Sequence, residues 1–590
     1  MLGCMTTQPT VTSIRVDDVP LLIGLMIQMG LPQLYEREVD DHGHHQGLSG
    51  GWLLAVWLAF ILSKGDHAKY RVQEWVNRHR AMLEALIGQP IRDTDFSDDR
   101  LGSVLKRLSH RARWEALETA LWRDSIAVYD LSDSSPSLAV IRVDSTTAYG
   151  NHQIEEGGLM QRGHSKDHRP DLPQLKLMTA AEQRSGCLLA SWVVSGNRAD
   201  DPLYLPIIQR ARAMLGSNGL LFVGDSKMAA LATRAEIAWH QDYYLTVLPN
   251  TGETKEQMMG WVEEAVSDPS LTKPIVDGQR PLGIGYEFER ENQAKIKVER
   301  RRRDVVWTER VQLIQSETLA TQQREQLEKR LRAAETQLRA LTPAAGRGKR
   351  CYREEAPLRE AEQRLLERHH VVGLLQVARR VEERQETRYV GRGRGGPNRP
   401  TMAVTHRRYF VADVQRQSAA IEQMRKRLGW RAQVTNAPVS KMSLDDAIVC
   451  YRNGWSGERN YHLLKGEPLG ISPLFVRKED QIIGLTHLLT LGVRLLSLIE
   501  LRVRRGLNAT GETIKGIYAG LPTHATARPT AIAILEMIAR MEITLTQIVV
   551  EGKSFVHLTP LPPLLETILS YLHLPLSLYT SPIDNSVLTT

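Results

Sequence analysis

The sequence has few cysteines, and its most apolar run is short. Its 590 residues include only four cysteines, and no two of them form a CxxC pair. This spacing argues against a zinc motif and against a disulfide-stapled scaffold, and it fits a reducing cytoplasm. The most apolar run, at 51–62, is shorter than the roughly 20 residues that cross a bilayer. We therefore expect a buried core helix there, no membrane contact, no secretion signal and a cytoplasmic location.

A strong net charge is also missing. Lysine and arginine number 76 against 68 acidic residues, which leaves a formal charge of +8. Hydrophobic residues make up 42% and charged residues 24%, as in soluble globular proteins. The modest basic excess favours an acidic partner such as nucleic acid, although basic chains are common. The length predicts about two to four domains.

The hydrophobic pattern changes along the chain and predicts its organisation. The N-terminal part is apolar and amphipathic with helical period, and the next part alternates strands with helices, which predicts a mixed α/β sheet. A looser region follows, and then apolar helices return before a tail without a usable motif. The predicted divisions are a helical domain at 1–130, an α/β core at 131–249 and 440–506, an inserted domain at 250–439, and a tail at 507–590.

Several local elements are specific enough to test. Residues 172–201 predict two strands around a turn at Arg184, Ser185 and Gly186. A leucine seam at 327–341 and a second helix at about 355–385 predict a helical hairpin in which the two apolar stripes bury each other. Residues 443–466 are predicted to form a single helix.

Two aspartates end apolar strands. Asp144 closes the strand at 138–144, and Asp225 closes the strand at 219–225. Either one alone is commonly a helix cap or a turn residue. A charge on a core element costs several kcal/mol unless it is paired or binds a metal. Two carboxylates that converge at a sheet edge provide the hard oxygen ligands of a Mg²⁺ site.

A third acid on a later helix would complete such a site, and Glu458 is the candidate. Tyr451 and Lys465 lie seven residues before and after it, so a continuous helix would place all three on one face. The bland alternative is an exposed face with a stray aromatic. The rival acids are Asp445, Asp446, Glu467, Glu479 and Glu500.

The order of these acids resembles the DDE transposases of bacterial insertion sequences, in the superfamily with a Tyr-Arg-Glu-Lys signature. The chain resembles the longer members, which carry an extra helical N-terminal domain, and the likeness covers about residues 10–500. It rests on six stretches taken in order, at 98–108, 143–150, 163–177, 196–201, 224–229 and 451–466.

The resemblance implies an α/β fold with an RNase H-like catalytic core, a large inserted domain and a helical N-terminal domain that binds DNA ends. Asp144, Asp225 and Glu458 would hold two Mg²⁺ ions, with Mn²⁺ as a substitute, for hydrolysis and strand transfer by cut-and-paste chemistry. The implied partners are double-stranded DNA, as terminal inverted repeats and as target, and a second copy of the chain on paired ends. The protein is therefore expected in the bacterial cytoplasm, associated with the nucleoid when it is bound to DNA.

The resemblance also implies DNA contacts around the triad. Tyr451 and Lys465 would contact phosphates near the scissile bond, and Arg452 and Arg459 lie nearby. The signature arginine position is held by Gly454. That departure leaves a second reading open, in which the chain is a catalytically decayed or repurposed transposase that only binds DNA.

Other stretches have a functional and a structural interpretation. His164, Lys166 and Arg169 would either meet phosphate or form a polar turn. The arginines at 300–303 would either follow a DNA backbone or be solvated. Residues 40–45 resemble a metal cluster, but a solvated loop is favoured. Trp307 and Trp430 are expected to pack in the core rather than stack on a flipped base.

Overall fold

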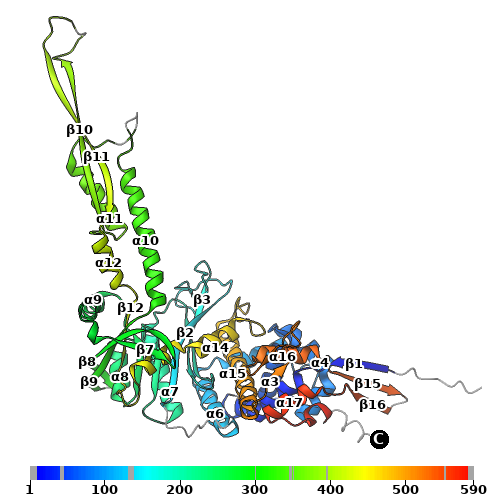
Figure 1. Cartoon of the computed structure of the whole chain (residues 1–590). Coiled ribbons are helices and arrows are strands. Elements are labelled where there is room, and N and C mark those ends of the chain that lie inside the picture. The colour runs from blue at the N-terminus through cyan, green and yellow to red at the C-terminus, as the bar shows by residue number, and fades with distance from the viewer. Residues whose placement is uncertain are drawn as a thin grey trace, which may run out of the picture.

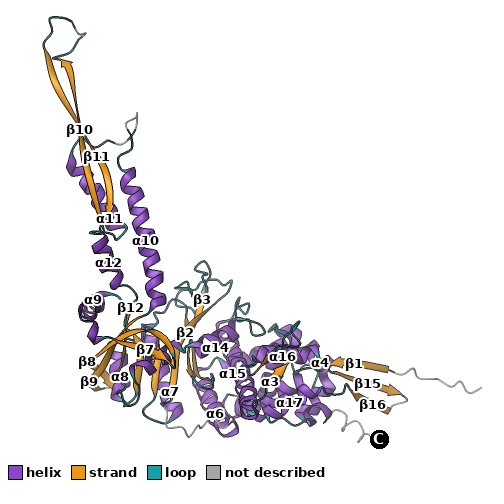
Figure 2. Ribbon diagram, viewed as in Figure 1, coloured by secondary structure: helices purple, strands orange, loops and turns teal. Residues whose placement is uncertain are grey.

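The computed structural model describes residues 10–39, 46–129, 138–298, 301–344, 349, 351–393, 396–550 and 553–581. A large mixed sheet with helices lies at the centre, a helical lobe lies to one side of it, and a narrow arm projects away (Figure 1). The mixed α/β architecture that the sequence predicts is confirmed by the secondary structure (Figure 2).

The central sheet has nine strands in the order β4-β3-β2-β5-β6-β12-β9-β8-β7. β2 pairs antiparallel with β3 and parallel with β5, and β5 pairs parallel with β6. The predicted hairpin is confirmed, since β3 and β4 are antiparallel neighbours around residues 184–186. The strands are β2 (Val140–Tyr149), β3 (Gln174–Glu182), β4 (Leu188–Ser195), β5 (Leu221–Gly224), β6 (Tyr243–Val247), β7 (Lys273–Asp277), β8 (Arg280–Val298), β9 (Arg301–Gln315) and β12 (Trp430–Thr435).

The sheet extends through the inserted region rather than stopping at its boundary. β7, β8, β9 and β12 come from residues 273–435, and β12 joins them to β6 by antiparallel pairing. The helices α7 (Asp201–Leu215), α8 (Leu231–Trp239) and α9 (Gly252–Ser267) accompany the sheet. Trp307 and Trp430 are buried in its core, as expected, where Trp307 Nε1 donates to Tyr244 Oη at 2.9 Å.

The helical lobe combines both ends of the described chain. Its hydrophobic core contains buried residues from 16–121 and from 463–579, so the tail packs on the N-terminal helices. The lobe contains α1 (Val19–Gln28), α2 (Leu31–Glu38), α3 (Gly50–Lys64), α4 (Lys69–Ile87), α5 (Asp98–Leu108), α6 (Arg111–Tyr129), α15 (Glu479–Thr510), α16 (Ala531–Arg540) and α17 (Pro563–Leu572). Beside them lies a small sheet of β1 (Thr10–Arg15), β15 (Thr544–Val550) and β16 (Lys553–Leu558).

Helix α15 lies in the hydrophobic core of the lobe. Among the described residues it alone is long and apolar enough to cross a membrane, but 94% of its most apolar window is buried inside the molecule. An all-round apolar helix of this kind is typical of a large protein core. Gly484 allows α15 to cross α5 closely, since a Cβ there would lie 2.0 Å from the Leu105 carbonyl oxygen.

A buried polar network joins the lobe to the sheet. Glu118 on α6 is fully buried and accepts hydrogen bonds from Arg210 on α7 and Arg494 on α15. It also accepts from the Ser191 hydroxyl on β4 at 2.8 Å. One carboxylate therefore ties three helices and a strand together.

His487 of α15 stands beside this network and predicts a pH effect. Its ring stacks on Trp114 at 4.2 Å, and its Nδ1–H donates to the Leu108 carbonyl. Burial lowers the pKa of His487 to about 4 from its ordinary 6.5. The unfolded chain therefore binds a proton that the folded chain excludes as the pH falls from 6.5 to about 4. This difference removes about 3 kcal/mol of unfolding free energy across that window.

Denaturant unfolding at pH 7 and pH 4.5 would measure this loss. The variant His487→Gln should be less stable at pH 7 but should depend less on pH than the wild type. The exposed-site control His168→Gln should keep the wild-type dependence. Equal pH dependence in all three proteins would contradict the role of His487.

The arm consists of α10 (Glu317–Ala340), α11 (Glu355–Arg368), α12 (Ser418–Lys426) and the two-stranded ribbon β10 (Leu375–Tyr389) with β11 (Thr401–Arg416). The leucine seam of α10 is buried, as predicted. The predicted helix at 355–385 is wrong beyond residue 368, because β11 pairs with residues 375–389 along their whole length. The seam therefore packs on the base of the ribbon and on α12 as well as on α11.

Candidate active site

Asp144 on β2 and Asp225, the residue directly after β5, lie at matching positions of two adjacent parallel strands. The β2–β5 ladder pairs residues 140, 141 and 142 with 221, 222 and 223. Continuing this register by two residues places Asp144 opposite Asp225. Neighbouring strands are about 4.8 Å apart, so the two carboxylates face the same small volume. The prediction that Asp144 ends its strand is wrong, because β2 runs on to Tyr149 by pairing with β3 alone.

Hydrogen-bond donors of the protein orient both carboxylates, but they bind only one of the two oxygens of each. Asp225 Oδ1 accepts from the Tyr204 hydroxyl at 2.6 Å and from the Lys227 backbone N–H at 2.9 Å. Asp144 Oδ1 accepts from the Ser145 N–H at 2.6 Å and lies 3.3 Å from Lys166 Nζ. Within the described part of the chain, the Oδ2 atom of each aspartate accepts no hydrogen bond.

The electrostatics of the pair suit a divalent cation. Removal from water raises the pKa of Asp144; Lys166 opposes this rise, and the charge of Asp225 adds to it. Two negative charges thus share one site. Among the described residues, Lys166 is the one cationic side chain that forms a hydrogen bond with either carboxylate. Hard oxygen ligands with uncompensated charge are the donor set that Mg²⁺ and Mn²⁺ take, so the residues fit such an ion.

The predicted single helix at 443–466 is wrong. It is two helices, α13 (Leu444–Arg452) and α14 (Trp455–Lys465), separated at Asn453 and Gly454. Asparagine and glycine are frequent at helix ends, because asparagine competes for backbone hydrogen bonds and glycine gains little from helix formation. Tyr451 therefore lies on a different helix from Glu458 and Lys465, and no stripe of three exists.

Helix α14 presents a different set of residues to β2 and β3. Tyr461, three residues after Glu458, shares a hydrogen bond of 2.7 Å with the Thr179 hydroxyl on β3. Burial raises the pKa of Tyr461, and the charge of Asp144 is the next largest cause. Sequence reasoning missed this tyrosine, although its i+3 spacing from Glu458 was a usable signal.

Lys465, at the end of the same face, reaches the aspartate pair indirectly. Its Nζ forms an ion pair with Asp167, and Asp167 accepts from the Thr147 hydroxyl on β2 at 3.0 Å. The middle of α14 is thereby fastened to β3 through Tyr461, and its end is fastened to β2 through Asp167, which holds Lys465 near the strand that carries Asp144.

Glu458 is exposed in the first turn of α14. It does not close a three-carboxylate cluster, since the described residues contain no group of three potential metal ligands. Its charge does act on Arg142 of β2, the residue two before Asp144. Glu458 therefore lies near the pair without joining it in this conformation.

The structure separates Glu458 from most rival acids. Asp446 belongs to the capping box of α13, and Asp445 accepts from the Val276 N–H. Glu479 accepts from the Leu159 N–H, and Glu500 is buried in ion pairs with Arg459 and Arg504. Glu458 and Glu467 remain without hydrogen-bond or ion-pair partners among the described residues.

The space beside Gly454 is taken by an arginine from another element. Arg142 extends from β2, donates to Gln183 Oε1 at 2.9 Å and to the Cys450 carbonyl, and lies 3.3 Å from where a Gly454 Cβ would be. Gly454 has φ −64°, so its conformation does not require glycine. The guanidinium of Arg142 therefore lies beside Gly454, although it comes from β2 and not from α13 or α14.

Substitutions at Gly454 test whether the missing arginine matters. Gly454→Ala should change the unfolding free energy by no more than about 1 kcal/mol, since only Arg142 must adjust. Gly454→Arg should not raise DNA cleavage and should cost about 1–2 kcal/mol, because the new charge crowds Arg142. Thermal unfolding and a cleavage assay measure both effects. A several-fold gain in cleavage by Gly454→Arg would show that the missing arginine limits activity.

The remaining predicted DNA contacts divide into two sets. Lys166 lies at the aspartate pair, and Arg452 is exposed at the end of α13. Arg169 forms a bidentate ion pair with Asp171, and His164 is an exposed residue of the same loop. The structure does not bring Arg459 to the site, because it is paired with Glu500, and burial lowers its pKa to about 10.

Two stretches singled out in the sequence cannot be placed in full. The histidine- and aspartate-rich residues 40–45 lie outside the described residues, as does Arg300 of the arginine run. Residues 301–303 begin β9 and are exposed.

The fold and the site together define a mixed α/β protein with a carboxylate pair on adjacent parallel strands. A protein-family comparison is more specific, because the model for the transposase DDE domain matches residues 136–492. The match covers more than half of the chain, so the chain belongs to this family. Both aspartates and Glu458 fall inside the matched region.

Other comparisons add little. A search of curated proteins found no match. A solved structure described as the piggyBac transposase synaptic complex with hairpin DNA is similar at 9% identity and a TM-score of 0.24. The likeness covers 47% of this chain and 60% of that one, so this chain spans less than two thirds of its length. A TM-score this low does not establish a shared fold.

Proposed function

We propose that the chain is a DNA transposase of a bacterial insertion sequence, which hydrolyses and then transfers DNA strands at the element's ends. The observation that carries this proposal is the placement of Asp144 and Asp225 at matching positions of β2 and β5, inside the region that belongs to the DDE family. Members of that family are in general nucleases and strand transferases that use divalent metal ions.

The finer fold assignment is an RNase H-like core. Its support is the strand order β4-β3-β2-β5-β6, with β2, β3 and β4 antiparallel and β5 and β6 parallel to β2. The remaining strands and the arm then form the insertion between Asp225 and Glu458, at 250–439. The helical lobe is the proposed reader of the DNA ends, and a homodimer on paired ends is the proposed assembly.

Asp144 and Asp225 would hold the metal through their free Oδ2 atoms, with Glu458 as the third ligand. Bound divalent cations would activate the attacking hydroxyl and neutralise charge on the phosphodiester in an in-line displacement. Tyr204 and the Lys227 N–H fix the orientation of Asp225, and Lys166 fixes that of Asp144.

Completion of the triad requires a movement of α14. Glu458 sits in its first turn, directly after the break at Asn453 and Gly454, whereas Tyr461 and Lys465 fasten the rest of the helix to the strands. The first turn would have to shift relative to Arg459, which is paired with Glu500, to bring the Glu458 carboxylate to the pair when the metal and DNA bind. Tyr451, on α13, and Lys465 would contact the DNA backbone from either side of it.

The test is metal-dependent cleavage of a labelled duplex that carries the element's own terminal repeat. With Mg²⁺ or Mn²⁺ the wild type should nick the duplex, and Glu458→Gln should bind it without cleavage. The matched control Glu467→Gln should cleave like the wild type. If the control fails to cleave while Glu458→Gln still cleaves, the third ligand is Glu467.

A second candidate function is DNA binding by a decayed transposase. Gly454 at the signature position and the open three-carboxylate arrangement favour it. Binding without cleavage by the wild type, in either metal, would support this alternative.

A further inference from the structure

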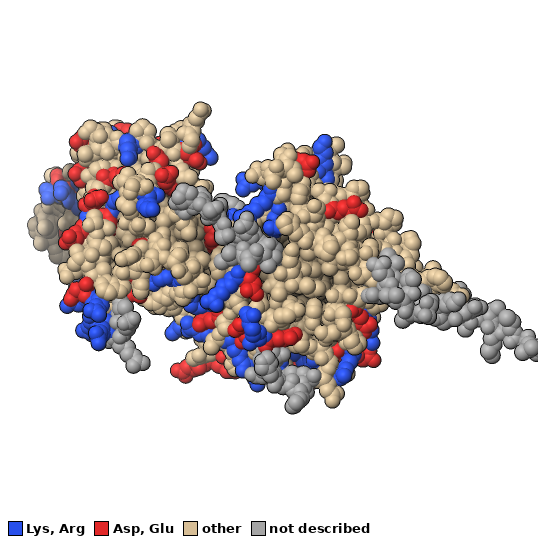
Figure 3. Space-filling view, turned by 90° about the horizontal axis from the view of Figure 1, so that it is seen from below, with Lys and Arg blue, Asp and Glu red and all other residues tan. Residues whose placement is uncertain are grey.

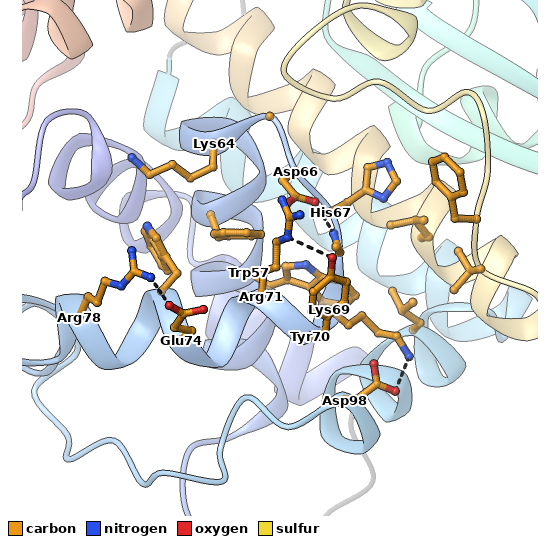
Figure 4. Close-up of a pocket in the computed structure, with 18 residues that line it drawn as sticks. Trp57, Lys64, Asp66, His67, Lys69, Tyr70, Arg71, Glu74, Arg78 and Asp98 are labelled. Carbon is orange, nitrogen blue, oxygen red and sulfur yellow. Dashed lines mark hydrogen bonds and ion pairs between the residues drawn. The ribbon is translucent and has the colours of Figure 1, made fainter.

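Many charged side chains elsewhere on the molecule form ion pairs. On the face seen from below, basic and acidic residues are interspersed over both lobes (Figure 3). A cavity of about 1070 Å³ beside α3 and α4 is lined by several cations (Figure 4). There Lys69 pairs with Asp98 at 2.9 Å, and Arg71 pairs with Asp66 at 2.8 Å. Such a cavity offers little excess charge to an anion.

A smaller cavity at the same edge of the sheet as Asp225 differs in this respect. Val247 lines it, and β6 pairs Thr246 with Gly224, the residue directly before Asp225. It has a volume of about 390 Å³, and no aspartate or glutamate is among the described residues that line it. Its floor is the sheet and its walls are the first turns of α10 and the end of α13. The lining residues include Arg431, Arg452, Tyr451, Gln322 and Gln433.

Two arginines line this cavity and a third lies near one of them, and none of the three has a counter-ion among the described residues. Arg431 on β12 and Arg452 on α13 line it, and Arg452 Nη2 lies 3.5 Å from the Leu282 carbonyl near the start of β8, the strand that Arg280 begins. The pKa of Arg452 is lowered by burial and then by the charges of Arg431 and Arg280. Across the described chain, no ion pair joins any of the three to a carboxylate.

Tyr451 connects this cluster to the aspartate pair. Burial raises the pKa of its hydroxyl; the charges of Asp225 and Asp144 raise it further, and the charge of Arg431 lowers it. The tyrosine therefore lies within the fields of both the carboxylates and the arginines. A strand whose scissile phosphate sits at Asp144 and Asp225 has its neighbouring phosphates within this region.

We propose that Arg280, Arg431 and Arg452 form a phosphate-binding cluster that holds the DNA backbone beside the scissile phosphodiester. The proposal rests on the proposed function for its ligand, and it adds two residues, Arg280 and Arg431, from the inserted region. Like charges are normally kept apart unless an anion joins them, and Arg–phosphate pairs are strong and often bidentate.

The salt dependence of DNA binding tests the cluster without requiring cleavage. A generic labelled duplex is titrated with the wild type, Arg431→Gln, the double variant Arg280→Gln/Arg431→Gln, and the charge control Arg368→Gln, all in EDTA. Arg368 is exposed at the end of α11 on the arm. Each arginine that no longer neutralises a phosphate should reduce the slope of log K against log salt by about 0.9. We expect a reduction of about one for Arg431→Gln, more for the double variant, and none for the control. Arg431→Lys should recover part of the slope.

Two further readings separate the alternatives. Without DNA, the double variant should unfold at the same or a higher temperature than the wild type, since repulsion is relieved. A drop of several degrees would mean that the arginines are structural and would overturn the proposal. The proposal would also be overturned if the salt-dependence slopes of the arginine variants equalled that of the control. Binding of inorganic phosphate at the site, with unchanged slopes for DNA binding, would overturn it as well. If the slopes fall but no duplex is cleaved, the cluster stands and the catalytic proposal fails.

Discussion

Asp144→Asn should lower metal-dependent DNA cleavage by about 10³-fold or more while the protein still binds DNA. The asparagine keeps the shape of the side chain but removes one of the two charges that face each other across β2 and β5. A metal site in phosphoryl transfer contributes several kcal/mol of charge stabilisation, and each 1.36 kcal/mol corresponds to tenfold in rate. Cleavage of the labelled terminal-repeat duplex, with binding measured in parallel, gives the result.

Stability gives an independent reading of the same variant. The pKa of Asp144 is raised in the folded protein, so the folded state favours the protonated carboxyl and loses stability as the pH rises above the ordinary 3.8. Metal-free Asp144→Asn should therefore be more stable than the wild type at neutral pH, and the difference should vanish below about pH 3.8. A less stable variant at pH 7 would mean that Asp144 is a structural residue.

Glu118→Gln should reduce the unfolding free energy by about 3–5 kcal/mol. Glu118 is fully buried and receives hydrogen bonds from both Arg210 and Arg494. Removing its charge leaves two guanidinium groups uncompensated between the lobe and the sheet, which is costly inside a protein. Denaturant unfolding at pH 7 measures the loss.

The matched control for that prediction is Glu360→Gln. Glu360 forms an exposed i,i+4 pair with Arg364 on α11. Exposed pairs of this kind contribute about 0–1 kcal/mol, so the control should resemble the wild type. Equal losses in the two variants would show that the Glu118 network does not join the two parts of the molecule.

The elements that sequence predicted well are those set by short-range patterns. The hairpin β3–β4 follows from two apolar segments around a turn that contains glycine. The buried seam of α10 was predicted from the spacing of its leucines. In each case the residues that decide the structure lie within a few positions of one another.

The errors come from interactions between distant segments. Residues 375–385 have a composition that suits a helix, but they pair with β11, which lies across a long turn. The helix around Tyr451 was predicted to be continuous because Asn453 and Gly454 only weaken a helix locally. Arg142, from a strand some 300 positions earlier in the chain, contacts that break.

The candidate site shows the same division. The sequence by itself determined a carboxylate after each of two apolar segments, the candidate third acid Glu458, and the order of motifs that resembles the transposase family. Only the tertiary structure placed Asp144 opposite Asp225, moved Tyr451 off the helix of Glu458, and brought Arg431 and Arg452 to one cavity with Arg280 near Arg452. The physical reason is that strand order and helix docking are decided by burial of whole faces, and no local pattern records which faces will meet.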